Sequence, residues 1–221
     1  MRLIFVRHGE PNYEKDCLTE RGRIEAALAA QRLLGENADT IFSSPQGRAL
    51  ETARALSERM GDKPVEVLDF MHEISWGSTD GEALFENGHP WSIADELVRQ
   101  GCELTRTDWR EHPLFRRNKA TACADRIAEE VDKWLKRLGY ERVGAYYRQS
   151  LDVENRRTYI LFSHGGSSTA ALAHILNLPF PYLLSLLHMP FTALNILRFD
   201  AEPGSVCQPH LELGCDASHI K

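Results

Sequence analysis

The sequence lacks the features that mark a membrane protein, a disulfide-bonded protein or a secreted precursor. Its apolar runs all fall short of the roughly 18–20 residues that a membrane-spanning helix requires. The apolar start of the chain meets Arg7 and His8 too early for a secretion signal. The five cysteines are an odd number and none is spaced Cys-x-x-Cys, which favours reduced thiols over disulfides or a zinc site. We therefore expect a cytoplasmic protein with no membrane partner.

An excess of positive charge is also missing. The 32 acidic residues outnumber the 26 basic ones, and the net charge of −6 argues against a nucleic-acid partner. The chain is 43% hydrophobic and 26% charged, close to ordinary globular proteins, so disorder is excluded. We expect one domain over residues 1–221, with an insertion or cap at about residues 77–119, where the regular pattern of strands and helices is interrupted.

What the sequence does contain is an alternation of short apolar runs and helical patterns. It predicts strands at residues 3–6, 40–43 and 65–68, with helices at 19–34 and 44–60 between them. Strands joined through helices pair in parallel and carry helices on both faces of the sheet. The prediction is an α/β fold, a three-layer α/β/α sandwich around a mostly parallel sheet.

The second half of the chain continues this pattern and then changes it. It predicts helices at 91–100, 120–138 and 167–176, a buried strand at 158–162, and closing strands at 191–199 and 206–213. The closing strands follow one another without a helix between them, so we expect them to be antiparallel at one edge of the sheet.

Local signals predict details of the first two helices. Ser44 and Pro45 read as an N-cap followed by proline in the first turn, and Gly35 as the end of the preceding helix. Ile24 and Leu28 lie at helical spacing, so we expect them to face the core.

Three polar motifs directly follow predicted parallel strands. They are Arg7-His8-Gly9-Glu10, Ser43-Ser44-Pro45-Gln46-Gly47-Arg48 and Ser163-His164-Gly165-Gly166. Ligands of open α/β sheets bind at the carboxyl ends of the strands. We therefore expect two histidines and two arginines to meet at one edge of the sheet.

These residue types suit a phosphoryl group. The planar guanidinium groups of Arg7 and Arg48 can each form two parallel hydrogen bonds to phosphate without losing their charge. A neutral histidine beside two cations can attack phosphorus, because the cations stabilise the developing charge and lower the imidazole pKa. Gly165 would let the backbone approach the ligand closely.

A phosphorylated histidine also requires a proton donor for the departing oxygen. Glu73 is the first carboxylate beyond the third strand, on the same edge of the sheet, and we expect it to be this acid. Crowding against a bound phosphate would raise its pKa. Asp80, Glu82 and Glu86 are the alternatives.

The motifs Arg-His-Gly-Glu at 7–10, Ser-x-x-x-Arg-Ala-x-x-Thr-Ala at 44–53 and Ser-His-Gly-Gly at 163–166 together resemble the histidine phosphatase superfamily. This is the phosphoglycerate mutase-like clan, and the segment from Glu73 resembles its cytosolic branch. The resemblance covers the first 81 residues and residues 158–199.

The resemblance implies a role for each matched residue. His8 would be the nucleophile that becomes phosphorylated, and Glu73 the proton donor and later the base. Arg7, Arg48 and His164 would hold the phosphoryl group. No metal and no cofactor would be needed.

The chain departs from the family pattern just after the first motif. Pro11, Asn12 and Tyr13 stand where family members usually have a serine or threonine and, shortly beyond, an asparagine that touches phosphate. Asn12 is therefore a candidate substrate-binding residue, and the departure concerns the substrate more than the reaction.

Other side chains in the middle of the chain could extend the substrate pocket. Trp76 follows the predicted acid closely and is a candidate substrate contact. His174 lies one helical turn too far from the sheet edge for catalysis. A basic cluster is either a solvated face or part of the pocket; it consists of Arg106, Arg110, Arg116, Arg117 and Lys119.

The sequence thus predicts a metal-independent phosphomonoester hydrolase that acts through a phosphohistidine on His8. Its partner would be a small-molecule phosphomonoester of unknown identity. One alternative is a phosphotransferase of the phosphoglycerate mutase type, which returns the phosphoryl group to a sugar acid. An alternative of another class is a non-catalytic module that binds a phosphorylated ligand. The oligomeric state stays open, a homodimer included.

Overall fold

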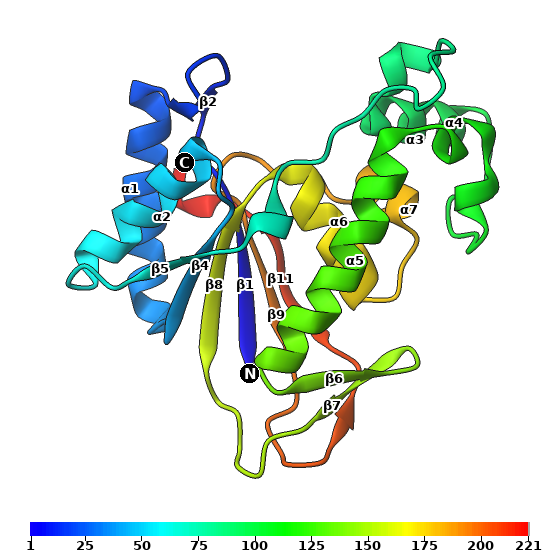
Figure 1. Cartoon of the computed structure of the whole chain (residues 1–221). Coiled ribbons are helices and arrows are strands. Elements are labelled where there is room, and N and C mark those ends of the chain that lie inside the picture. The colour runs from blue at the N-terminus through cyan, green and yellow to red at the C-terminus, as the bar shows by residue number, and fades with distance from the viewer. Residues whose placement is uncertain (221) are drawn as a thin grey trace.

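A six-stranded sheet forms the centre of the computed structural model, which describes residues 1–220 (Figure 1). Its strands are β1 (Arg2–Arg7), β4 (Thr40–Ser43), β5 (Val65–Val67), β8 (Thr158–Ser163), β9 (Leu194–Arg198) and β11 (His210–Asp216). The strand order is β11-β9-β1-β8-β4-β5. The pairs β1–β8, β8–β4 and β4–β5 are parallel, whereas β9 is antiparallel to both β1 and β11.

Helices cover both faces of this sheet. The α-helices of the described residues are α1 (Glu20–Leu33), α2 (Gly47–Arg59), α3 (Pro90–Arg99), α4 (Pro113–Arg116), α5 (Lys119–Arg137), α6 (Gly165–Ile175) and α7 (Phe180–Leu186). Figure 1 shows α1 and α2 on one side of the sheet and α5 and α6 on the other. The short 3-10 helices are η1 (Leu34–Glu36), η2 (Asp69–Met71), η3 (Phe85–Gly88), η4 (Trp109–Glu111) and η5 (Ser218–Ile220).

The alternation of side chains along β1 shows why the sheet needs two helical layers. Leu3 and Phe5 point to one face and join a core with residues of α5, α6 and α7. Ile4 and Val6 point to the other face and join a core with α1 and α2. A strand that is apolar on both faces must be covered on both. The predicted three-layer α/β/α fold with a mostly parallel sheet is thus confirmed.

Two small sheets lie outside the central one. β2 (Pro11–Asn12) pairs with β3 (Cys17–Leu18), and β7 (Tyr146–Gln149) pairs with both β6 (Tyr140–Val143) and β10 (Val206–Cys207). The β6–β7 hairpin and α7 are absent from the sequence prediction. The predicted strand at 206–213 is split, because β10 joins the hairpin and only β11 reaches the central sheet.

The prediction for α1 is wrong about which face is buried. Ile24 is 59% exposed and Leu28 is 41% exposed. The buried face instead carries small residues, Ala26, Ala29 and Ala30. Alanines allow α1 to lie close to its neighbours, and a search for large apolar side chains at helical spacing overlooks such a face.

Three helix ends also differ from the prediction. α2 begins at Gly47 with Gln46 as its N-cap, so Ser44 caps nothing. The chain continues past Gly35 as η1 and turns at Asn37, whose φ of 51° lies in the left-handed region. α6 begins at Gly165, so the two glycines form its first turn.

The segment at 77–119 departs from the layered arrangement. Its two ends meet, since Ser78 forms an antiparallel bridge with Asn118. The Asn118 side-chain amide donates to the Gly88 carbonyl 2.8 Å away. Between these ends, α3 packs against α7.

Candidate active site

The register of the parallel strands brings the predicted motifs together. Arg7 at the end of β1 pairs with Ser163 at the end of β8, and Ser43 at the end of β4 pairs with Phe162. The next residues along the chain therefore leave the sheet side by side. The His8 and His164 rings lie 5.1 Å apart, centroid to centroid, at 61°.

His8 presents an unprotonated nitrogen to this site. Its Nδ1 lies 2.7 Å from the Gly9 carbonyl oxygen, which can only accept, so Nδ1 carries the proton. Arg48 Nε donates to the remaining nitrogen, His8 Nε2, at 3.3 Å. Burial, together with the positive charges of Arg7 and Arg48, lowers the pKa of His8 to about 3. His8 is therefore a neutral base near pH 7.

His164 forms its hydrogen bond through Nε2, whereas His8 uses Nδ1 for its bond to the backbone. Ser44 Oγ lies 2.7 Å from His164 Nε2 and accepts from the Gln46 N–H at 3.3 Å. The Ser44 hydroxyl can donate to Nε2 while it accepts from Gln46, and in that arrangement the imidazole proton lies on Nδ1. Nδ1 is buried and has no partner within residues 1–220. Burial, and then the neighbouring His8, lower the pKa of His164.

Arg48 is held by an acidic residue that sequence reasoning missed. Its Nη1 pairs with Asp16 Oδ1, and Asp16 Oδ2 accepts the Gly47 N–H at 2.7 Å. Asp16 lies in the turn before β3 with a φ of 48°. No sequence signal marks it, because its role depends on a partner 32 residues away.

Arg7 is positioned by a loop near the end of the chain. Its Nη1 donates to the Met189 carbonyl oxygen. Its guanidinium carbon lies 4.4 Å from the centre of the Phe191 ring, a cation–π arrangement. The Nε of Arg7 is buried and has no partner within residues 1–220.

Glu73 lies against the N-terminus of α6. Its carboxylate accepts N–H groups from Ile74 at 2.9 Å, Gly166 at 3.3 Å and Ser167 at 3.0 Å. Burial raises the pKa of Glu73 above its ordinary value, against the opposing effect of these hydrogen bonds. A raised pKa suits a carboxyl group that must carry a proton near neutral pH.

The alternative acids lie elsewhere. Asp80 is exposed and pairs with Arg117 at 3.2 Å. Glu82 and Glu86 are exposed as well. None of the three lines the cavity that contains Glu73.

A cavity of about 450 Å³ opens beside Glu73. It reaches Arg7 and Gly165, the chain neighbours of His8 and His164. Its full lining is Arg7, Tyr13, Glu73, Trp76, His89, Trp91, Asp95, Gly165, Thr169, Leu184, Ser185, Leu187, His188 and Met189. Trp76 was anticipated from the sequence, whereas Tyr13, His89, Asp95 and His188 were missed.

Asn12 is engaged away from this cluster. Its carboxamide oxygen accepts the Lys15 N–H at 3.1 Å. Within residues 1–220 no hydrogen bond joins its side chain to Arg7, His8 or Arg48. Its assignment as a substrate-binding residue stays a prediction.

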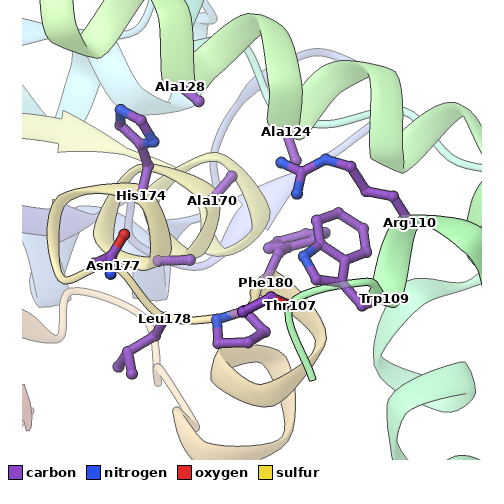
Figure 2. Close-up of a pocket in the computed structure, with 12 residues that line it drawn as sticks. Thr107, Trp109, Arg110, Ala124, Ala128, Ala170, His174, Asn177, Leu178 and Phe180 are labelled. Atoms are coloured by element: carbon purple, nitrogen blue, oxygen red, sulfur yellow. The ribbon is translucent and has the colours of Figure 1, made fainter. Parts of the chain in front are cut away.

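The basic cluster of the middle segment does not line this cavity. Arg110 and His174 instead line a second cavity of about 240 Å³ between α5, α6 and the start of α7 (Figure 2). There Arg110 lies over Trp109, 4.4 Å from the ring centre, and pairs with Asp125. The two cavities share no lining residue.

Residues 1–220 contain neither a side-chain cluster suited to a metal ion nor a helix suited to crossing a membrane. No group of three or more histidine, cysteine, aspartate or glutamate side chains is placed to bind a metal ion. Among the helices described, none is both long and apolar enough to cross a membrane.

The mostly parallel sheet brings two histidines and two arginines to its carboxyl edge, an arrangement suited to binding a phosphoryl group. A sequence profile of the histidine phosphatase superfamily (branch 1) matches residues 3–208. The chain belongs to that superfamily.

Named relatives agree with this class. The chain is 27% identical over 220 residues to the glucosyl-3-phosphoglycerate phosphatase of Mycolicibacterium vanbaalenii, covering 92% of this chain and 88% of the relative. The solved structure of a mycobacterial glucosyl-3-phosphoglycerate phosphatase with inorganic phosphate has a TM-score of 0.65 and 25% identity, covering 100% of this chain and 99% of that one. A phosphoserine phosphatase of Entamoeba histolytica shares the fold, with a TM-score of 0.64, 21% identity and coverage of 100% and 99%. The chain is accordingly a phosphatase that acts on phosphomonoesters.

Proposed function

We propose that the chain hydrolyses a small-molecule phosphomonoester through a phosphohistidine on His8. The observation that carries the proposal is the state of His8, which is buried and neutral and whose Nε2 lone pair faces a guanidinium. Such an imidazole can attack phosphorus, and adjacent cations stabilise the charge that develops on the phosphoryl oxygens.

The reaction would proceed in two steps. His8 Nε2 forms a bond to phosphorus while the ester P–O bond breaks, and the proton of Glu73 goes to the departing alcohol oxygen. The Glu73 carboxylate then takes a proton from water, whose oxygen attacks the phosphohistidine and releases inorganic phosphate and neutral His8. Arg7, Arg48 and His164 Nδ1 donate to the phosphoryl oxygens throughout.

The substrate class is narrowed only by analogy. The relatives' names give phosphoserine and glucosyl-3-phosphoglycerate as substrates of those proteins, so a metabolite-sized ester is the natural proposal for a cavity of about 450 Å³.

We also propose that residues 77–119 form a cap on this cavity, because His89, Trp91 and Asp95 of that segment line it. All five cysteines are free thiols, which supports a proposed cytoplasmic location.

Trapping of the intermediate tests the proposal. The protein is mixed with a radiolabelled phosphomonoester, quenched in base and digested, and label on the peptide that contains His8 is the expected result. A phosphohistidine is stable in base and labile in acid, unlike a phosphoserine, so the quench separates the two. Loss of both label and phosphate release in a folded His8→Ala variant completes the test, whereas equal phosphatase activity in wild type and variant would contradict it.

The same preparation separates the alternatives. A mutase would form 2-phosphoglycerate from 3-phosphoglycerate without releasing phosphate, and a binding module would do neither. Vanadate, which mimics the phosphoryl group in transfer, should inhibit far more strongly than phosphate.

A further inference from the structure

One wall of the active-site cavity is aromatic and acidic. It consists of Trp76, His89, Trp91 and Asp95, which we call the cap wall. Trp91 and Asp95 lie four residues apart on α3 and therefore on one face of that helix. The Trp76 ring stands nearly perpendicular to Trp91, at 89° and 6.5 Å between centroids, and to His89, at 86° and 5.3 Å.

The charges that line this cavity favour a cation over an anion beyond the phosphate. Arg7 is the single arginine or lysine among the residues that line it, and the proposed mechanism assigns Arg7 to the phosphoryl group. His89 adds no positive charge, because its Nδ1 accepts the Ser92 N–H at 3.3 Å and burial lowers its pKa. Asp95 therefore faces the cavity without a cation of the cap wall beside it.

The ring geometry favours a rounded cation over a flat base. A planar base stacks on one ring or between two parallel rings, whereas a positively charged nitrogen is attracted to ring faces that converge from different directions. Trp76 stands near 90° to both Trp91 and His89, which are tilted 34° to each other, so no two tryptophan rings are parallel. With a carboxylate on the same cavity, this arrangement favours the second case.

We propose that the alcohol portion of the substrate carries a positively charged nitrogen, an amine or a quaternary ammonium, held by Trp76, Trp91 and Asp95. This inference rests on the proposed phosphatase function. It separates the chain from phosphatases of carboxylate-bearing esters, since the cap wall offers such a carboxylate no cationic partner and places Asp95 against it.

The test compares two esters of the same shape. 3,3-Dimethylbutyl phosphate has a neutral carbon where phosphocholine has its charged nitrogen. The ratio of the kcat/KM value of phosphocholine to that of the carbon analogue therefore isolates the effect of the charge. We expect this ratio to be on the order of tenfold or more, the size of a cation–π contact together with an ion pair. O-Phosphoethanolamine extends the comparison to a primary amine, and 3-phosphoglycerate to an anion.

Variants assign the preference to the cap wall. Asp95→Asn and Trp76→Leu should each lower the ratio severalfold. Asp125→Asn is the matched control, because it removes the same charge from α5 beside the second cavity and should leave the ratio unchanged.

The outcomes distinguish this inference from the function on which it rests. Hydrolysis of p-nitrophenyl phosphate that depends on His8, with a ratio near one or with 3-phosphoglycerate preferred, would overturn the cation site and keep the phosphatase. A nucleoside monophosphate preferred over all amines would overturn it in favour of base stacking. A folded protein that hydrolyses none of these esters would contradict the proposed function itself.

Discussion

A single methyl group at Gly166 should disable the proposed acid without touching the nucleophile. A Cβ at this position would lie 2.4 Å from Ile74 Cγ1, 2.6 Å from Ile74 Cδ1 and 2.7 Å from Glu73 Oε1. Separations below about 3 Å are not tolerated by packed atoms, so Glu73 and its neighbour must move. Glu73 would then lose its hydrogen bonds to the N-terminus of α6.

The expected cost in activity follows from what the acid contributes. General acid catalysis is worth typically 10²–10⁴-fold, and the neighbours of Glu73 can relax only partly, so we expect Gly166→Ala to lower kcat on an alkyl phosphate by about 10²-fold. Stability should change little. Overpacking costs about 1–3 kcal/mol, and replacing glycine by alanine within a helix returns about 1 kcal/mol.

The leaving group provides the control within the assay. A nitrophenolate departs readily without a proton, whereas an alkoxide does not, so Gly166→Ala should slow p-nitrophenyl phosphate hydrolysis far less than alkyl phosphate hydrolysis. Gly165→Ala is the neighbouring comparison, since its Cβ would meet Arg7 Nε and Trp91 Cζ2 at an ordinary 3.7 Å; we expect its alkyl phosphate rate to fall less than tenfold. A wild-type alkyl phosphate rate in Gly166→Ala would refute the placement of Glu73 as the acid.

Four other expectations concern the remaining parts of the site. Arg48→Ala should lower kcat by about 10²-fold or more, measured by phosphate release, and an unchanged rate would remove Arg48 from the site. Ser44→Ala should lower kcat by about tenfold, because the proton on His164 is no longer directed to Nδ1, and Ser44→Thr should restore it. The pKa of His8 is about 3 in the folded chain and near 6.5 in the unfolded chain. Neutral His8 therefore contributes fully to the free energy of unfolding above pH 6.5, and this contribution is lost as the pH falls toward 3. Urea titrations should show that His8→Gln removes up to about 1.4 kcal/mol per pH unit of this acid sensitivity; identical slopes would contradict it. EDTA should leave the phosphatase rate intact, and loss with rescue by a divalent ion would point to a metal.

The clustering of the site residues at one edge of the sheet could be predicted from little more than the order of strands and helices along the chain. His8, Arg48 and His164 each follow a short apolar run, and parallel pairing makes the ends of such runs meet. The register between Arg7 and Ser163 then fixes the two histidines beside each other. The local sequence pattern was sufficient to predict this clustering, because nothing in the sequence of these strands favours another structure.

The supports of those residues could not be predicted in the same way. Asp16 and Met189 act on Arg48 and Arg7 across 32 and 182 residues, through a turn carboxylate and a backbone carbonyl that any sequence could supply. The face of α1 was misread for a related reason, since close packing of alanines outweighed the exposed Ile24 and Leu28. Such features are decided by packing between distant segments of the chain, which the local pattern of a single sequence does not reveal.

We propose different chemical roles for the two histidines, and their hydrogen-bond partners give a physical reason for the difference. In His8 the Gly9 carbonyl accepts the Nδ1 proton, whereas in His164 the Ser44 hydroxyl lies against Nε2, and its donation there goes with a proton on Nδ1. In the proposed mechanism the nitrogen left for the substrate is a lone pair in His8 and an N–H in His164, so His8 would attack phosphorus and His164 would donate to its oxygens. Burial keeps both imidazoles uncharged. Because His8 cannot move its proton from Nδ1 without losing the hydrogen bond to the Gly9 carbonyl, the proposed division of labour depends on the strand end on which each ring lies.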